Sequence, residues 1–147
     1  MPRFIVFVRG NPDTDGEAKP DAEALAVMGK YNATLIEAGV LLAGEGLLPS
    51  RHGRRITFTP DAAPKVEAGP FPPNELVSGW WIFKTKDVEE AVEWAKKSPL
   101  AGHPGGHVVL EVRKIAEAED FGEALGEEGR AREASMRAQM EKLAKEG

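Results

Sequence analysis

Runs of β-branched and aromatic residues predict the strands of this chain. Positions 3–9 form an unbroken apolar run between two arginines, as expected of a central strand. Positions 54–59 and 107–113 alternate apolar and polar residues, whereas 76–84 carries large apolar residues at successive positions. Positions 40–48 read as a kinked or bulged strand because glycine interrupts them twice, and positions 65–67 could return along 54–59 as a hairpin arm.

Two segments carry apolar residues at helical spacing. The first covers about positions 21–38 and ends before Gly39, which suits the C′ position. Its expected buried stripe consists of Leu25, Met28, Leu35 and Ile36, with Tyr31 and Asn32 as further candidates. The second helix begins after Asp87, an N-cap residue followed three positions later by Glu90, and stops at Ser98-Pro99.

Beyond position 114 the composition becomes highly charged and indicates a further helix. Three acid–base pairs at i,i+4 place the acid first, the orientation that favours a helix. Glycines at 126 and 129 predict a break or kink. A narrow stripe of Met136, Met140 and Leu143 is too small to form a core, so we expect it to dock on the domain or on a partner subunit. The sequence thus predicts a domain at 1–115 and a helical extension at 116–147.

The order of these elements predicts an α+β fold. Strands and helices follow one another as β-α-β-β-(β)-β-α-β, which matches a ferredoxin-like, split βαβ plan. Both helices would then cover one face of the sheet. A second copy of the chain, packed sheet to sheet, would cover the other face and would explain the aromatic residues on both sides of 76–84.

Composition narrows the range of functions. The chain has 147 residues, a formal net charge of −5 and no cysteine. The acidic balance argues against a nucleic-acid partner. Without cysteine, disulfides, thiolate chemistry and cysteine-bound metals are excluded, which fits the reducing cytoplasm. The apolar run at 3–9 is too short to span a membrane or to form a signal peptide, so no membrane association is expected.

An ordered set of short motifs resembles the YCII-related family, in its DGPF-domain branch. The set comprises Gly44-Glu45-Gly46-Leu47, Gly69-Pro70-Phe71, Gly79-Trp80-Trp81, Glu90 to Ala95 and Glu111-Val112-Arg113. The resemblance covers about positions 1–115. It implies a dimeric α/β barrel of ferredoxin-like subunits and a cleft lined by the Gly69-Pro70-Phe71 loop and the strand ends. Some family members look like small enzymes with a His–Asp pair, and others occur near sigma factors of the extracytoplasmic type.

The chain departs from the family pattern at three places. Ala68 stands where the branch has the aspartate that precedes Gly-Pro-Phe. The segment after Phe71 reads Pro72-Pro73-Asn74, where the family commonly has an acidic residue, and it is about one residue shorter. The first helix has no histidine, so the His–Asp pair of the wider family is missing. These three differences weaken the transfer of a catalytic role from the family to this chain.

Histidines near the last strand are the candidate catalytic residues. His103 and His107 flank Pro104-Gly105-Gly106, and Glu111 follows on the strand. Imidazole titrates near neutral pH and a carboxylate can orient it, so the three form a candidate acid–base group. The alternative is a surface loop with ordinary histidines. Pro104 and the glycines exclude the helical spacing of a metal site, and we predict neither metal nor cofactor.

Five further residues are candidates for ligand binding. Glu45 lies between two glycines that allow close backbone approach, and Phe71 belongs to a proline-fixed loop. Trp80 could stack on a planar group, and Arg9 and Arg113 could bind an anion. Each has a structural alternative as a core, interface or surface residue. A calcium-like run from Asn11 to Gly16 lacks the glutamate that its twelfth position needs, and we do not assign it to calcium.

Two functions remain open from the sequence. The first is a small cytoplasmic homodimer with a cleft that binds, and could turn over, a small polar metabolite. The second is a non-catalytic interaction or regulatory protein of the sigma-factor-associated type, which the missing acidic and histidine residues favour. The sequence leaves undecided whether the protein is an enzyme.

Overall fold

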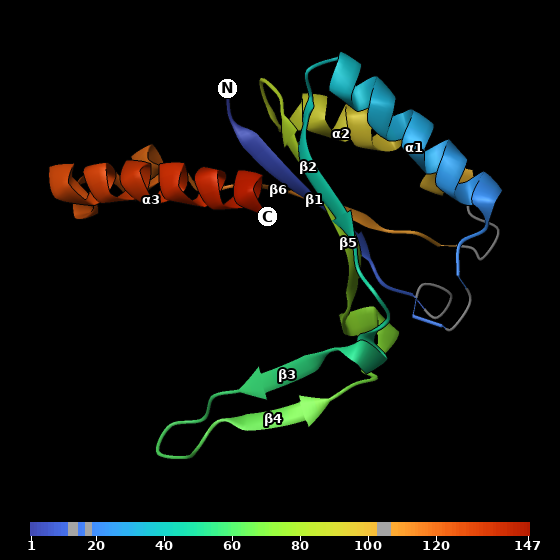
Figure 1. Cartoon of the computed structure of the whole chain (residues 1–147), viewed down its shortest axis with the longest axis horizontal. Coiled ribbons are helices and arrows are strands. Elements are labelled where there is room, and N and C mark those ends of the chain that lie inside the picture. Colours follow the sequence, from blue (N-terminus) through green and yellow to red (C-terminus); the bar gives the residue numbers. More distant parts are fainter. Residues whose placement is uncertain (12–14, 17–18, 103–106) are drawn as a thin grey trace. The chain divides into compact units, whose positions relative to one another are not determined.

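A computed structural model describes residues 1–11, 15–16, 19–102 and 107–147 of the chain. The chain forms two compact units, Met1–Lys114 and Ile115–Gly147. The first unit combines an antiparallel sheet with two helices (Figure 1), as the α+β prediction requires.

The sheet of the first unit has the ferredoxin-like strand order. Its strands are β1 (Arg3–Arg9), β2 (Leu41–Gly46), β5 (Val77–Lys84) and β6 (Leu110–Lys114), in the antiparallel order β2-β5-β1-β6. Helix α1 (Ala22–Glu37) connects β1 to β2, and α2 (Val88–Lys96) connects β5 to β6. Each connection passes over one intervening strand, which confirms the split βαβ prediction.

A separate hairpin is inserted between β2 and β5. It consists of β3 (Arg54–Thr57) and β4 (Lys65–Ala68), which pair with each other and form their own two-stranded sheet (Figure 1). Within its described residues, the unit also contains the short 3₁₀ turns η1 (Ser50–His52), η2 (Pro73–Glu75) and η3 (Pro99–Gly102). The first two of these turns border the hairpin in the sequence.

Both helices pack on one face of the sheet. Alternate residues of β1 and β5 are buried there, with Val6 opposite Trp81 and Phe4 opposite Phe83. Leu35 of α1 is also fully buried in this core. The indole nitrogen of Trp81 donates to Asn32 Oδ1 at 3.0 Å. The core therefore lies between α1, α2 and this face.

The ends of the helices follow the local signals in the sequence. Asp21 and Asp87 are the N-caps, and each accepts a hydrogen bond from the backbone N–H three residues on. At the end of α1, Gly39 has a φ of 72°, and Val40 N donates to Leu35 O at 2.9 Å. This is the Schellman arrangement, in which a left-handed glycine lets the chain turn back on the last helical turn.

The buried face of α1 differs from the predicted stripe. Tyr31 and Leu35 are buried, but Leu25 and Ile36 are 60% and 62% exposed. The sheet meets the line through Met28, Tyr31 and Leu35, and Ile36 is rotated about 100° from Leu35 on the helix. Tyr31 Oη also donates to Trp94 O at 2.8 Å, so a bond to α2 fixes the orientation of α1.

Strand β2 contains the predicted irregularity. Its register with β5 shifts between Leu41 and Ala43, so Leu42 is the extra residue of a bulge. After the bulge, Gly44 lies against Trp81, and a Cβ added at this glycine would stand 2.9 Å from the indole ring. The bulge and the glycine together let this edge strand follow the aromatic strand closely.

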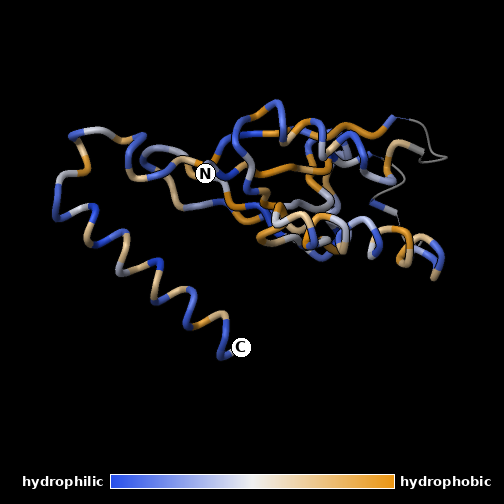
Figure 2. Tube along the Cα trace, turned by 90° about the horizontal axis from the view of Figure 1, so that it is seen from above, coloured by the Kyte–Doolittle hydropathy of each residue, from blue (hydrophilic) through white to orange (hydrophobic). Residues whose placement is uncertain are grey.

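The second unit consists of a 3₁₀ segment, η4 (Ala118–Ala124), and helix α3 (Gly126–Glu146). Gly122 and Gly126 have positive φ, which confirms the predicted break at Gly126, whereas Gly129 lies within α3, packed against Leu125. Hydrophilic residues dominate α3, and apolar positions interrupt them (Figure 2). Met136, Met140 and Leu143 are exposed. In the described parts of the chain, no helix is both long and apolar enough to cross a membrane.

Candidate functional site

A hollow of about 610 Å³ lies between the end of β2, the first 3₁₀ turn and the end of the hairpin. Two stretches of sequence supply its walls, residues 46–55 and residues 71–78, and Asp15 adds a side chain from the loop after β1. The polar or charged side chains in the lining are those of Asp15, Ser50, His52, Arg54, Arg55, Glu75 and Ser78. This hollow is the candidate site.

Two glycines allow the segments around the hollow to approach one another. At Gly69 an added Cβ would stand 1.9 Å from the carbonyl oxygen of Ser50, and the Gly69 N–H donates to Gly53 O at 3.2 Å. At Gly10 an added Cβ would stand 2.8 Å from Pro73 O. Because a side chain at either position would collide with backbone, the Gly69-Pro70-Phe71 loop and η2 can pack as they do only with glycine there.

Ser50 ties three segments together at one end of the hollow. Its N–H and its hydroxyl each donate to Asp15, at 2.6 Å in both cases. The same hydroxyl oxygen accepts the N–H of Phe71 at 2.9 Å. The bonds from the hydroxyl and the N–H of Ser50 lower the pKa of Asp15, so its carboxyl group is ionised. Asp15 therefore serves here as a fixed acceptor that joins the loop after β1 to η1.

Arg55 organises the opposite wall. Its guanidinium carbon lies 4.2 Å from the centre of the Phe71 ring, a cation–π arrangement. One terminal nitrogen contacts Glu75 Oε2 at 3.3 Å, and the other donates to Glu75 O at 3.4 Å. Phe71, a predicted ligand-binding residue, thus lines the hollow and has a fixed position beneath Arg55.

Four other predicted site residues lie on the sheet face away from α1 and α2, namely Glu45, Trp80, Glu111 and Arg113. Glu45 is opposite Trp80, Trp80 is opposite Phe7, and Phe7 is opposite Glu111, so these residues form one row across the sheet. Arg113 belongs to the next row. Glu45 and Glu111 occupy the two edge strands, which three strand spacings separate by about 14 Å. The sheet therefore does not bring these two carboxylates together.

Arg9 and Glu111 do form a pair. Arg9 Nη1 lies 2.8 Å from Glu111 Oε1, and the two side chains are 41% and 40% exposed. Such exposed ion pairs contribute about 1 kcal/mol or less to stability. The carboxylate of Glu111 is thus occupied by an arginine on the neighbouring strand.

The candidate acid–base group is only partly described. His103 lies outside the described residues. His107 is exposed just before β6, and its carbonyl oxygen accepts a hydrogen bond from Asn11 Nδ2 at 3.3 Å. The pairing of a histidine with Glu111 stays a prediction.

The calcium-like run is likewise only partly described, because Asp13 lies outside the described residues. Asp15, the next acid of the run, is bonded to Ser50. Among described residues, no three His, Asp or Glu side chains group closely enough to hold a metal ion.

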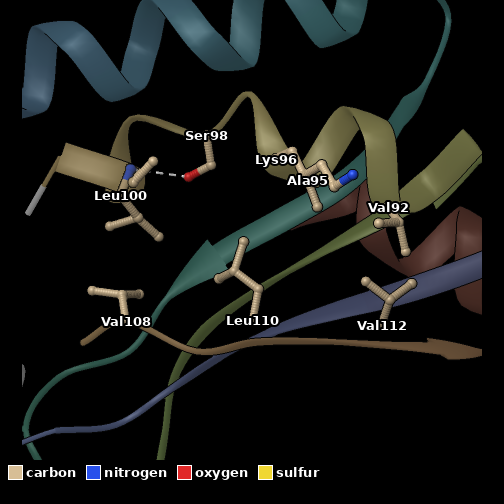
Figure 3. A pocket seen from close by; sticks show the side chains of 9 residues that line it. Val92, Ala95, Lys96, Ser98, Leu100, Val108, Leu110 and Val112 are labelled. Carbon is tan, nitrogen blue, oxygen red and sulfur yellow. Dashed lines mark hydrogen bonds between the residues drawn. The ribbon is translucent and has the colours of Figure 1, made fainter.

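A second hollow, of about 370 Å³, lies between α2, η3 and β6 (Figure 3). Its lining is mainly aliphatic: Val92, Ala95, Leu100, Ala101, Val108, Leu110 and Val112. The Ser98 hydroxyl accepts the Leu100 N–H at 3.1 Å, and Lys96 Nζ contacts Glu93 at 2.8 Å. With its polar groups engaged in this way, the second hollow offers fewer groups for binding or chemistry than the first.

Sequence reasoning missed most of the side chains that build the candidate site. Asp15, Ser50 and Arg55 are separated in the sequence, and each is an ordinary loop or strand residue by local pattern. One available signal was the proline- and glycine-rich stretch around Phe71, which predicted a rigid wall. Another was Glu75, an acidic residue four positions before Gly79-Trp80-Trp81.

Comparison with known proteins identifies a family. A search of curated proteins found no match to the chain. A family model described as the YCII-related domain matches residues 3–116, which include every strand of the structure and both helices of the first unit. The chain therefore belongs to the YCII-related domain family.

Proposed function

We propose that this protein binds a small polar metabolite in the hollow between η1, β3 and the Phe71 loop. The main support for this proposal is that hydrogen bonds and a cation–π contact fix the polar side chains around this space. Ser50 and Asp15 are bonded to each other on one side, and Arg55 is fixed by Phe71 and Glu75 on the other. The volume of about 610 Å³ falls in the range of small-molecule sites, and fixed polar groups in a concave site are what orient a ligand.

The proposal favours binding over a defined reaction. Asp15 is ionised and doubly bonded to Ser50, and Glu75 is paired with Arg55, so neither acid is free to act as a base. The group of His103, His107 and Glu111 remains our candidate for acid–base chemistry. The DGPF branch, to which we assign the chain on its Gly69-Pro70-Phe71 motif, is the context of this proposal, and the absence of cysteine supports a cytoplasmic setting.

Phe71 provides a direct test. A panel of small acids, amines, sugars and nucleosides is screened against the full chain by ligand-observed saturation-transfer NMR. We expect at least one compound to bind the wild type and to lose most of its signal with Phe71→Ala. Phe121→Ala, which truncates an exposed phenylalanine of the second unit, serves as the matched control and should bind normally. A hit that binds Phe71→Ala as well as wild type would contradict the proposed site.

We further propose that the first unit forms a homodimer through the open face of its sheet. The centre of this face is apolar and consists of Ile5, Phe7, Trp80 and Ile82. Helices α1 and α2 lie on the opposite face. A second copy would cover this centre and complete a dimeric α/β barrel. Light scattering at micromolar concentration should give twice the mass of one chain, and Phe7→Glu should give one chain mass. A monomeric wild type would refute this part.

An interaction role is the second candidate, and the exposed apolar residues of α3 favour it. Met136, Met140 and Leu143 recur at helical spacing and are all exposed, although the rest of α3 is strongly hydrophilic. Exposed apolar side chains on a charged helix suit recognition by a partner protein. Binding of a purified extracytoplasmic-type sigma factor should then be lost in Met140→Glu but kept in Gln139→Glu. Equal binding by both variants, or none by the wild type, would exclude this role.

A further inference from the structure

The charged groups around the hollow are not equally engaged. Among the residues that the structure describes, four charged side chains line it: the carboxylates of Asp15 and Glu75 and the guanidinium groups of Arg54 and Arg55. Asp15 accepts two hydrogen bonds from Ser50, and Glu75 pairs with Arg55. Within the described ranges, Arg54 has no acidic partner. Of these four side chains, Arg54 is the one that, among the described residues, donates only to a backbone carbonyl, that of Gly53, so most of its N–H donors are unused.

The backbone holds Arg54 in place. It is the first residue of β3, where it pairs with Ala68 of β4, and its Nη1 donates to Gly53 O at 2.8 Å. A guanidinium group has five N–H donors in a rigid planar fork. One donor is used on Gly53, so enough remain to bind a carboxylate or a phosphate through two parallel hydrogen bonds. His52, which also lines the hollow, adds an imidazole near the same residue.

The cross-strand neighbour of Arg54 is the uncharged residue Ala68. It stands opposite Arg54 in the hairpin, and its methyl side chain carries no charge. An aspartate at this position would lie across the strand pair from Arg54, where opposite charges attract. With alanine there, the cross-strand neighbour leaves the charge of Arg54 uncompensated.

The rest of the lining is suited to an apolar group. Leu47 and Leu48 follow β2, line the hollow and are exposed to solvent. The Phe71 ring, with Arg55 on one face, forms a further wall. A ligand that covered these side chains would remove apolar surface from water, which is favourable.

We infer that the hollow binds an organic anion, whose carboxylate or phosphate is held by Arg54 and whose short apolar body contacts Leu47, Leu48 and Phe71. This inference rests on the proposed function and names its ligand class. A cationic ligand is disfavoured because Glu75 is already paired with Arg55 and Asp15 already accepts two hydrogen bonds from Ser50. An uncharged ligand would leave Arg54 without a charged partner.

Four probes test the inference by amide shifts in two-dimensional NMR of the full chain: hexanoate, butyl phosphate, the neutral hexanamide and inorganic phosphate. We expect hexanoate or butyl phosphate to shift amides of residues 47–55 and 71–78. Hexanamide should bind at least about tenfold more weakly, because it lacks the charge-assisted bonds to a guanidinium. Comparing the two anions separates a carboxylate ligand from a phosphate ligand.

Variants at Arg54 complete the test. Arg54→Gln should weaken anion binding about tenfold or more, and Arg54→Lys should weaken it less, because the charge remains but the planar fork is lost. Arg132→Gln removes an exposed arginine of α3 and should bind like the wild type. Both arginines are exposed, so thermal melting should show all variants folded.

Four results would overturn the inference. Equal affinities for hexanoate and hexanamide, or unchanged anion binding in Arg54→Gln, would show that charge is not recognised. Inorganic phosphate binding as tightly as butyl phosphate would show that no apolar body is recognised. If no probe shifted the amides of the hollow, the ligand class would be wrong, and the Phe71 comparison would still decide the proposed function independently.

Discussion

Substituting Gly69 by alanine should disrupt the candidate site specifically. The new Cβ would stand 1.9 Å from Ser50 O and 2.6 Å from Ser50 C, whereas real Cβ contacts are essentially never shorter than 3.0 Å. The backbone would have to move by about 1.1 Å to relieve the collision. Ser50 cannot yield freely, because its N–H and hydroxyl are bonded to Asp15 and Phe71.

The expected cost combines strain with lost hydrogen bonds. Forcing extra atoms into a packed site costs about 1–3 kcal/mol. Moving Gly69 also weakens its bond to Gly53 O and the bond between Phe71 N and Ser50 Oγ, each a contribution of about 1 kcal/mol. We therefore expect the free energy of unfolding to fall by roughly 2–4 kcal/mol. Urea denaturation followed by tryptophan fluorescence measures this value.

Gly46→Ala is the matched control. Gly46 lines the same hollow, but an added Cβ there would meet no atom within 4 Å. Replacing glycine in a strand by alanine should change stability by less than about 1 kcal/mol, and in the stabilising direction. If Gly69→Ala and Gly46→Ala had equal stabilities within about 0.5 kcal/mol, the close packing of the Phe71 loop on η1 would be refuted.

Three further predictions concern the core, the single tyrosine and the surface pair. Leu35→Ala should lower the free energy of unfolding by about 2–5 kcal/mol and Leu25→Ala by less than about 1 kcal/mol; equal losses in denaturation would contradict the observed face of α1. Burial raises the pKa of Tyr31 from 10.0 to about 12, so stability should be full below pH 10 and should fall as the pH rises from 10 towards 12. Since the chain has one tyrosine, tyrosinate absorbance reports it directly, and a folded-state midpoint at 10 would refute the burial. Glu111→Gln should cost less than about 1 kcal/mol in thermal or urea unfolding, because its pair with Arg9 is exposed; a larger loss would give this pair a structural role.

Local signals in the sequence were sufficient for both ends of α1 and for the start of α2, whereas the last strand begins at Leu110 and not at the predicted position 107. Asp21, Asp87 and Gly39 mark helix ends because each satisfies backbone groups within a few residues of itself. The face of α1 was not predictable in this way. Apolar residues occur on more than one side of that helix, and the hydrogen bond of Tyr31 to Trp94, 63 positions away, helps to select the side that meets the sheet.

The candidate site depends even more on long-range contacts. The bond between Asp15 and Ser50 joins residues 35 positions apart, and the bond of Ser50 to Phe71 spans another 21. No local pattern distinguishes these residues from other loop residues. Conversely, Glu45 and Glu111 both belong to motifs that resemble those of the family, but the strand order places them at opposite edges of the sheet. Only the pairing of all four strands decides this separation.

The location of the ligand is the most direct test of the proposed site. Amide shifts of the full chain are measured by NMR during titration with a compound found in the panel screen. We predict that the largest shifts fall on residues 47–55 and 71–78, around the hollow that Ser50 and Arg55 organise. Largest shifts on the row from Glu45 to Glu111, or on the aliphatic hollow beside β6, would contradict the assignment.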